Sequence, residues 1–355
     1  MHCRVAVDAM GGDHAPGVIV RGAVEAASLD PEMTLVLVGE ADRIEAELSA
    51  ANGWNDPGAP TTGRPIDPSL ALRARHERVR VVHASQSIGM EEHPVAALRR
   101  KQDSSLLRMV QLAADREVDA VVSAGNTGAC AAACQLKLRP LRCVSRPGIG
   151  VTIPTFYGPV VLCDVGANIH AKPHHLYEYA LMASLYAEKL LDIQCPRVAL
   201  LSIGTESLKG TELVRLAHEL LKADDSVAFM GNIEGRDLFN DACDVAICDG
   251  FVGNLLLKLA EGLAEGLFRT ISSEIGEACP ELSDRFAPIM DRVRSRHDYS
   301  EYGGAPLLGV DGTCIICHGR SNERAIRNAV LTALKFHRLG FNKAIAARME
   351  PVAAN

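Results

Sequence analysis

Short apolar runs rich in β-branched residues alternate along the chain with longer segments in which apolar residues recur at helical spacing. Such runs are typical of buried strands, and the segments between them are long enough for helices. Together they predict a three-layer α/β/α fold, in which helices cover both faces of a mainly parallel sheet. The predicted strands span 4–9, 34–39, 78–84, 119–125, 148–154, 159–167, 197–204, 227–233, 245–250 and 313–319, and the predicted helices include 17–28, 40–51, 94–115, 174–191, 210–222 and 321–338.

Two segments interrupt this alternation. Residues 52–69, NGWNDPGAPTTGRPIDPS, are rich in Gly and Pro and predict a surface loop. Residues 254–298 contain a long amphipathic pattern, a break at ACPEL and a second helical pattern, which together predict a projecting helical hairpin. We therefore interpret residues 1–355 as a single α/β catalytic domain from which this hairpin and this loop project.

Five of the predicted strand-to-helix turns combine small residues with polar side chains. Ligands of an open parallel sheet bind beyond the carboxyl ends of its strands. Glycine lets backbone amides approach a ligand closely, a helix N-terminus favours anions, and Asn, Thr and Lys add donors. One such turn is ordinary in a parallel sheet, but five together indicate a shared anion site. The turns contain Asp8, Gly11, Gly12, Asp13 and His14; Gly125, Asn126, Thr127 and Gly128; Asn168 and Lys172; Thr205, Glu206, Lys209 and Gly210; and Phe251, Gly253 and Asn254.

Composition restricts the class of protein. Of the 355 residues, 48% are hydrophobic and 23% are charged, as in a globular protein, and the formal net charge of −7 argues against nucleic acid as the main partner. No apolar run approaches the roughly 18 residues of a membrane span. The 11 cysteines predict reduced, mostly buried thiols of a cytosolic protein rather than a disulfide framework.

Several familiar signatures of cofactor chemistry are absent from the sequence. No GxGxxG follows a predicted strand, and neither GxxxxGK with Ser or Thr nor G-x-S-x-G occurs. Cys314 and Cys317 would point to opposite faces of a strand, and Cys130 and Cys134 share a helix face but lack partners. We therefore predict core packing for these thiols, no metal site and no cofactor.

The polar turns lie within a series of motifs that resembles the PlsX family, the phosphate acyltransferases of bacterial phospholipid synthesis. The resemblance implies a fold like that of phosphotransacetylases and isocitrate dehydrogenases, a homodimer, and peripheral association with the inner face of the membrane. It also implies transfer of a long-chain fatty acyl group from acyl carrier protein to inorganic phosphate, giving an acyl phosphate for the membrane glycerol-3-phosphate acyltransferase. The motifs are VDAMGGDHAP, PVAALRRKQDSS, VSAGNTGA, DVGAN, IGTESLKGTEL, GNIEGRD, CDGFVGN, YGGAPLLGVDG, HGRSN and AARME.

The sequence departs from the family pattern at a few positions. Thr205 stands where an acidic residue is common, His170-Ala171 where Asp-Cys is usual, and Gly235 where alanine is usual. The loop at 52–69 is also longer than is usual in the family. The roles of the 168–172 and 205–209 turns therefore stay open.

The predicted chemistry needs no covalent enzyme intermediate, because phosphate is itself a nucleophile. The enzyme has to orient phosphate and stabilise the oxyanion that forms at the thioester carbon. We expect Asp8 and Asp13 to orient donors, while His14 and His318 are candidates for proton exchange; for His318 a structural role is the alternative. The predicted phosphate ligands are Gly11, Gly12, Gly125, Asn126, Thr127, Gly128 and Asn168, and the predicted charge-neutralising residues are Lys172, Lys209 and Asn254.

The resemblance also suggests two contact surfaces. Acyl carrier protein is acidic, so it would dock on a basic patch, either Arg99, Arg100 and Lys101 or Arg292, Arg294 and Arg296; a solvated helix face explains the first group equally well. In the hairpin, packing within a dimer or a core is favoured for the apolar stripe, and lipid contact is expected at the tip, at Leu282, Phe286 and Ile289. The stripe comprises Leu255, Leu256, Leu259, Leu263, Leu267, Phe268 and Ile271.

Two alternatives belong to different classes. A coenzyme A-dependent phosphotransacetylase-like enzyme with a short-chain substrate would use the same turns. A non-catalytic, membrane-docked scaffold is disfavoured by the density of polar turns at strand ends. A dehydrogenase of the isocitrate type is disfavoured by the missing nucleotide fingerprint.

Overall fold

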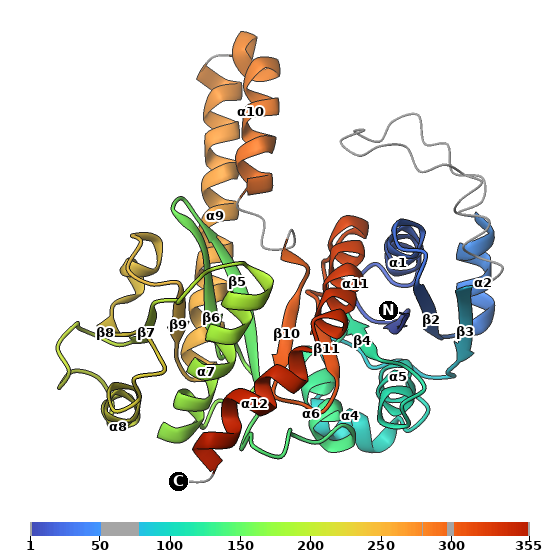
Figure 1. Ribbon diagram of the computed structural model, residues 1–355. Helices are drawn as coiled ribbons and strands as arrows, with labels where there is room; N and C mark the ends of the chain where they lie inside the picture. The colour runs from blue at the N-terminus through green and yellow to red at the C-terminus, as the bar shows by residue number, and fades with distance from the viewer. Residues whose placement is uncertain (1, 51–77, 279, 297–301, 354–355) are drawn as a thin grey trace. The chain divides into compact units, whose positions relative to one another are not determined.

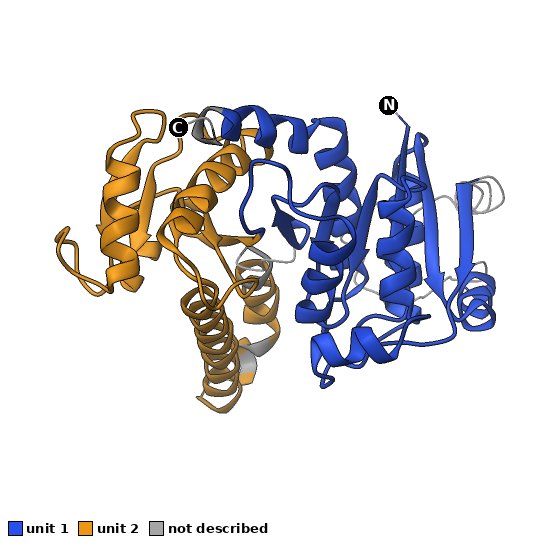
Figure 2. Cartoon of the chain, turned by 90° about the horizontal axis from the view of Figure 1, so that it is seen from below, with its two compact units in different colours: residues 1–147, 300–355 blue, residues 148–299 orange. Residues whose placement is uncertain are grey.

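A computed structural model describes residues 2–50, 78–278, 280–296 and 302–353. The predicted loop at 52–69 lies outside the described residues. Contacts divide the chain into two compact units (Figure 2), one made of 1–147 with 300–355 and the other of 148–299. The interpretation as a single domain stays a prediction.

The first unit is built on a mostly parallel sheet with the strand order β3-β2-β1-β4-β11-β10 (Figure 1). Strand β10 runs antiparallel to its neighbour β11, and the pairs β3·β2, β2·β1, β1·β4 and β4·β11 are parallel. Helices α1 and α11 cover one face, and α5 and α6 cover the other. The strands are β1 (Cys3–Asp8), β2 (Met33–Gly39), β3 (Val79–His83), β4 (Ala120–Ser123), β10 (Ala305–Leu308) and β11 (Thr313–Ile316), and the helices are α1 (Gly17–Leu29), α2 (Ala41–Ala50), α4 (Pro94–Arg100), α5 (Ser105–Ala114), α6 (Thr127–Lys137), α11 (Glu323–Arg338) and α12 (Phe341–Ala353).

The second unit has the strand order β5-β6-β9-β7-β8. Strands β5 and β6 form an antiparallel hairpin, and β6, β9, β7 and β8 are parallel. Helices α9 and α10 lie side by side and project from this sheet (Figure 1). The strands are β5 (Gly148–Thr155), β6 (Gly158–Cys163), β7 (Val198–Leu201), β8 (Phe229–Ile233) and β9 (Val245–Ile247), and the helical segments are α7 (Pro173–Leu190), α8 (Glu212–Lys222), η2 (Gly235–Phe239), α9 (Gly250–Ala278), η3 (Pro280–Leu282) and α10 (Ser283–Arg296).

The strands bury side chains on both faces, which is why their sequences read as continuous apolar runs. Every residue of β4 and β7 is buried. The close approach of α1 and α11 in the first unit depends on Gly22, because a Cβ there would lie 2.4 Å from the Glu323 carbonyl oxygen. The core of each unit therefore holds the strand ends, and the turns that follow them, in fixed places.

The mainly parallel α/β architecture and the helical hairpin are confirmed, with two local corrections. The helix predicted over 94–115 is two helices, because the Ser104 hydroxyl accepts a hydrogen bond from the Leu107 N–H and starts α5 there. Strand β10 was not predicted, because Pro306 and the glycine pair at 303–304 resemble a loop. Both glycines have positive φ (80° and 81°), and the strand starts directly after them.

Candidate active site

The first two predicted turns meet in the first unit, at the carboxyl ends of the neighbouring strands β1 and β4. A Cβ on Gly11 would lie 2.8 Å from the Gly125 nitrogen, so the two turns are in direct backbone contact. Gly12 has φ +106°, and its own Cβ would lie 3.1 Å from the Gly319 carbonyl oxygen. The Asp13 N–H donates a 2.8 Å hydrogen bond to that same oxygen. Three turns, after β1, β4 and β11, therefore form one cluster, which we call the unit 1 cradle (residues 8–14, 123–128 and 318–319).

The Asp8 carboxylate links two turns of the cradle through hydrogen bonds. It is buried, and its carboxylate accepts hydrogen bonds from the Ser123 hydroxyl (2.9 Å) and the Met10 N–H (3.3 Å). The Ser123 oxygen in turn accepts from the Gly125 N–H (3.0 Å). Burial raises the pKa of Asp8. These contacts suit a residue that positions the turns rather than one that attacks a substrate.

Asn126 holds the start of α6 against the loop at 89–94. Its Oδ1 accepts from the Ala129 N–H (3.0 Å), which caps the helix. Its Nδ2 donates to the carbonyl oxygens of Met90 and Glu92, at 3.0 Å each. The side-chain amide that was expected to bind phosphate is therefore engaged within the protein.

The groups that remain for a ligand in the cradle are mainly backbone amides. The first N–H groups of an α-helix have no acceptor within the helix, and Asn126 satisfies that of Ala129 only. The N–H groups of Thr127 and Gly128 therefore point out of the α6 N-terminus, where an anion is favoured. Gly128 is needed for this packing, because a Cβ there would lie 2.8 Å from the Pro94 ring.

The remaining predicted residues of the cradle lie at its rim. Asp13 and His14 are exposed, and His318 is half-buried. The Nδ1 of His318 accepts a 3.2 Å hydrogen bond from the Arg320 N–H, so the neutral ring carries its proton on Nε2. This arrangement gives His318 a defined tautomer beside Gly319.

In the second unit, the 164–168 turn is organised by Asp164. This buried carboxylate accepts from the N–H groups of Ile149 (2.9 Å), Ala167 (3.0 Å) and Asn168 (2.7 Å). The Asn168 carbonyl accepts from the Gly250 N–H (2.9 Å), which ties the turn to the start of α9. The Asn168 amide also donates to the Tyr179 hydroxyl (2.8 Å). Asn168 is thus a structural residue of the turn in addition to its predicted role.

Asp164 makes stability depend on pH. Burial raises its pKa from 3.8 to about 6, although the three N–H groups oppose this. Because the folded-state pKa is raised, the folded protein binds the proton more tightly, and the contribution to stability present below pH 4 is lost as the pH rises to about 6. The displacement corresponds to ~3 kcal/mol. We expect the free energy of unfolding of wild type, relative to Asp164→Asn, to fall by about this amount between pH 4 and 7; a difference independent of pH would contradict it.

The other charged candidates of this unit follow neighbouring strands. Lys172 and Asn254 are exposed at the N-termini of α7 and α9, and Lys209 is exposed in the turn after β7. Because β6, β9 and β7 are adjacent and parallel, their turns leave the same edge of the sheet. The structure thus brings together the first two predicted turns in one unit and the last three in the other. Joint use of both sets by one ligand stays a prediction.

Sequence reasoning missed several residues that hold these turns. Ser123 and Asp164 belong to the motifs VSAGNTGA and DVGAN, and their position at strand ends was the available signal. Glu92 was missed because it precedes α4, whereas its partners stand at the far end of that helix, eight and nine residues later. It pairs with Arg100 and Lys101, and the Lys101 ammonium holds the pKa of Glu92 down at about 2.

The predicted docking and membrane residues are placed as follows. Arg99 is exposed, whereas Arg100 and Lys101 share Glu92. Arg292 is exposed on α10, and the side chains of Arg294 and Arg296 lie outside the described residues. Leu282 is half-buried, and Phe286 and Ile289 are exposed. Along α9, Leu255, Leu259, Leu263, Leu267 and Ile271 of the predicted stripe are exposed.

One statement about the cysteines was wrong. Cys130 and Cys134 do have a partner, because Cys314 of β11 reaches the same face of α6. The Cys314 sulfur lies 3.4 Å from that of Cys134 and 3.9 Å from that of Cys130. All three are buried. Three thiols at these distances could ligate a soft metal ion, and they also suit a core of small apolar side chains.

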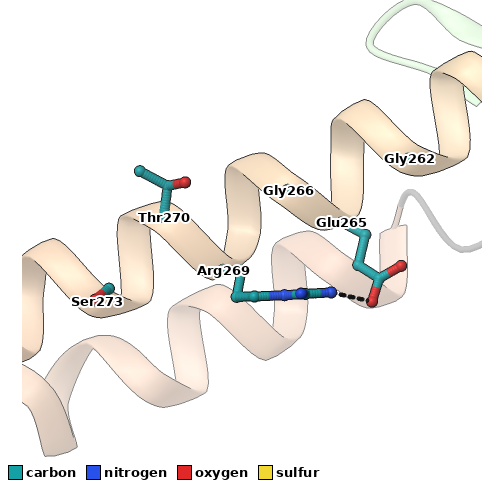
Figure 3. A pocket seen from close by; sticks show the side chains of 6 residues that line it. All are labelled: Gly262, Glu265, Gly266, Arg269, Thr270 and Ser273. Carbon is teal, nitrogen blue, oxygen red and sulfur yellow. Dashed lines mark hydrogen bonds and ion pairs between the residues drawn. The ribbon is translucent and has the colours of Figure 1, made fainter.

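A hollow of about 470 Å³ lies along α9, away from these turns (Figure 3). It begins at Gly262, about 12 Å of helix beyond Asn254. Arg269 and Glu265, which line it, pair at 2.6 Å, and Gly266, Thr270 and Ser273 complete it. A stripe of small residues beside an ion pair offers no reacting group, so this hollow is not the candidate active site.

Comparison with known proteins decides the family. A family model described as "Fatty acid synthesis protein" matches residues 3–56 and 63–344. The phosphate acyltransferase of Pelotomaculum thermopropionicum is 44% identical over 332 residues, which cover 93% of this chain and 90% of the relative. The chain belongs to the PlsX family of phosphate acyltransferases. Another PlsX member, the phosphate acyltransferase of Desulforamulus reducens, is 42% identical over 98% of this chain and 97% of its own.

The family assignment confirms that the chain is an acyltransferase of fatty acid and phospholipid synthesis. A phosphotransacetylase from Streptococcus pyogenes has a similar structure, with a TM-score of 0.59 at 16% identity over 95% of this chain and 94% of that chain. The EutD phosphotransacetylase from Staphylococcus aureus gives a TM-score of 0.57 at 11% identity, with the same coverage. At these identities the likeness shows the fold alone. Among the described residues, no helix combines the length and apolar character that crossing a bilayer requires.

Proposed function

We propose that this PlsX-family chain transfers a long-chain acyl group from acyl carrier protein to inorganic phosphate. The observation that carries the proposal is the unit 1 cradle, in which Asn126 presents the N-terminus of α6 beside the close-packed backbone of Gly11 and Gly125. A group of backbone N–H donors at a helix N-terminus suits a phosphate ion. Its one serine, Ser123, is buried, and its hydroxyl is engaged with the Asp8 carboxylate and the Gly125 N–H. The cradle therefore suits direct attack by phosphate better than a covalent enzyme intermediate.

The proposed reaction balances without a cofactor. A phosphate oxygen attacks the thioester carbonyl carbon, a C–O bond forms, and the C–S bond then breaks to release the carrier thiol. The proton that phosphate carries at neutral pH is transferred to the departing sulfur. Lys172, Lys209 and Asn254 are the proposed donors to the oxyanion of the intermediate, and phosphate held in place contributes through proximity.

The test of the function is direct detection of the product. We expect the pure protein, incubated with palmitoyl-acyl carrier protein and phosphate, to form an acyl phosphate that hydroxylamine traps as the hydroxamate. Omitting phosphate should abolish the signal. Faster turnover of acetyl-coenzyme A than of the palmitoyl carrier would favour a phosphotransacetylase instead, and no hydroxamate from either donor would refute the proposal.

The partners follow from the same proposal. Acidic acyl carrier protein would dock on Arg99 and its neighbours or on Arg292 of α10, so its KM should rise with ionic strength; a KM indifferent to salt would count against this docking. We also propose a homodimer that rests peripherally on the inner face of the membrane through Phe286 and Ile289. There the membrane glycerol-3-phosphate acyltransferase would consume the acyl phosphate. Vesicle flotation of Phe286→Asp tests the membrane contact, and unchanged binding would refute it.

A further inference from the structure

Large apolar side chains are exposed within the polar turns of the second unit. Ile203 is 81% exposed and Leu208 is 82% exposed, in the same turn as Lys209. Ile169, next to Asn168, is 60% exposed, and Phe251, in the first turn of α9, is 63% exposed. A single exposed apolar side chain is ordinary, but a group of them on a surface marks a site of interaction.

These four side chains follow neighbouring strands of one sheet edge. Ile169 follows β6, Phe251 follows β9, and Ile203 and Leu208 follow β7, in the spatial order β6-β9-β7. The pairs β6·β9 and β9·β7 are both parallel, so the three turns leave the sheet at the same end. Adjacent strands are about 4.8 Å apart, which puts the turns within reach of one extended ligand.

The turn that bears Ile203 and Leu208 is held in place. The Glu206 carbonyl accepts from Nδ2 of Asn232 (2.9 Å) and from the N–H of Lys209 (3.0 Å). Asn232 is buried, and its Oδ1 lies 3.0 Å from Nδ1 of His218, which is also buried. The two aliphatic side chains are therefore exposed on a turn that is anchored to β8 and α8.

We infer that Ile169, Ile203, Leu208 and Phe251 contact the aliphatic chain of the acyl substrate. This inference rests on the proposed function. It assigns the fatty chain of the substrate to four residues that have no role in the proposed reaction. A fatty thioester has a carbonyl that needs donors, attached directly to methylenes that need apolar surface. The turns after β6, β9 and β7 offer both donors and apolar surface, because each turn carries an exposed cation or amide together with an exposed apolar side chain. Along the apolar stripe of α9, by contrast, the cation beside Leu259 is Lys258, which is paired with Glu261 at 3.7 Å.

The test compares donors that differ only in chain length. For Ile203→Ser and Leu208→Ser, we expect the ratio of kcat/KM for palmitoyl- over butyryl-acyl carrier protein to fall about tenfold each, because one buried aliphatic side chain accounts for a factor of that order. Leu29→Ser, which changes an aliphatic side chain 57% exposed at the end of α1 in the other unit, is the matched control and should leave the ratio unchanged. Binding of palmitate, measured by calorimetry, should weaken in the two variants and not in the control.

The outcomes separate the inference from the function on which it rests. An active wild type whose chain-length ratio is the same in all three variants would overturn the inference alone. A change in oligomeric state of Ile203→Ser or Leu208→Ser, seen by size exclusion, would assign the surface to a second copy of the chain and also overturn it. An inactive wild type would refute the proposed function, and weaker palmitate binding by the two variants would then still support the chain contact.

Discussion

Replacing Asn126 with alanine should lower kcat/KM for phosphate by about 100-fold or more. The change removes the cap of α6 and the hydrogen bonds to the carbonyls of Met90 and Glu92, so the N-terminus of α6 and the loop at 89–94 would separate. A displacement of reacting groups by about 1 Å can cost a factor of this size. The loss should appear mainly in the kinetics, because a helix cap contributes only about 1–2 kcal/mol to stability. Steady-state assays at varied phosphate concentration measure it.

Asn322→Ala provides the matched control. Asn322 caps α11 in the same unit, accepting a 2.9 Å hydrogen bond from the Ala325 N–H, as Asn126 caps α6. Its loss should reduce the free energy of unfolding by about 1 kcal/mol while the KM for phosphate stays near that of wild type. Equal kinetic losses in both variants would mean that the loss of a helix cap explains the effect, and not the loss of the hydrogen bonds from Asn126 to the carbonyls of Met90 and Glu92.

Replacing Gly253 with alanine should destabilise the second unit by about 2–3 kcal/mol. Alanine favours a helix over glycine by about 1 kcal/mol at an exposed site, but a Cβ on Gly253 would lie 2.0 Å from the Asp164 carbonyl oxygen. Backbone atoms cannot rotate away, so α9 has to shift from the 164–168 turn, and overpacking of this kind costs about 1–3 kcal/mol before the loss of the Asn168–Gly250 hydrogen bond is counted. Urea denaturation measures the change.

Gly262→Ala, in the same helix, should have the opposite sign. Nothing lies within 4 Å of a Cβ built on Gly262, so the helix propensity of alanine is gained without a clash, which stabilises by about 0.5–1 kcal/mol. The two substitutions are chemically identical and differ only in surroundings. Similar stability changes in both would show that the contact between α9 and the 164–168 turn is not as close as described.

The arrangement of strands and helices could be predicted because burial on both faces leaves a direct trace in the sequence. Strands such as β2 and β4 are continuous apolar runs, and the lengths between them suit crossover helices. The break between α4 and α5 shows where this fails, since the polar run at 99–105 resembles the exposed face of one continuous helix, and the Ser104 cap is what starts α5. Local periodicity did not reveal that the chain divides into two compact units. These units are residues 1–147 with 300–355 and residues 148–299.

The site could be predicted at the level of turns and less well at the level of atoms. Glycines and polar residues after strands marked the unit 1 cradle, because strand ends of a parallel sheet meet at one edge. Sequence could not tell that the amides of Asn126 and Asn168 are used within the protein, since their partners are the Met90 and Glu92 carbonyls and the Tyr179 hydroxyl. The partner of Cys130 and Cys134 was missed for the same reason, because Cys314 is remote in sequence.

A crystal structure of the protein with bound phosphate would show whether the unit 1 cradle is the phosphate site. We expect a phosphate ion at the N-terminus of α6, accepting hydrogen bonds from the N–H groups of Thr127 and Gly128 beside Gly11 and Gly12. An ion bound at another place, with the turns after β1 and β4 empty at saturating phosphate, would contradict it.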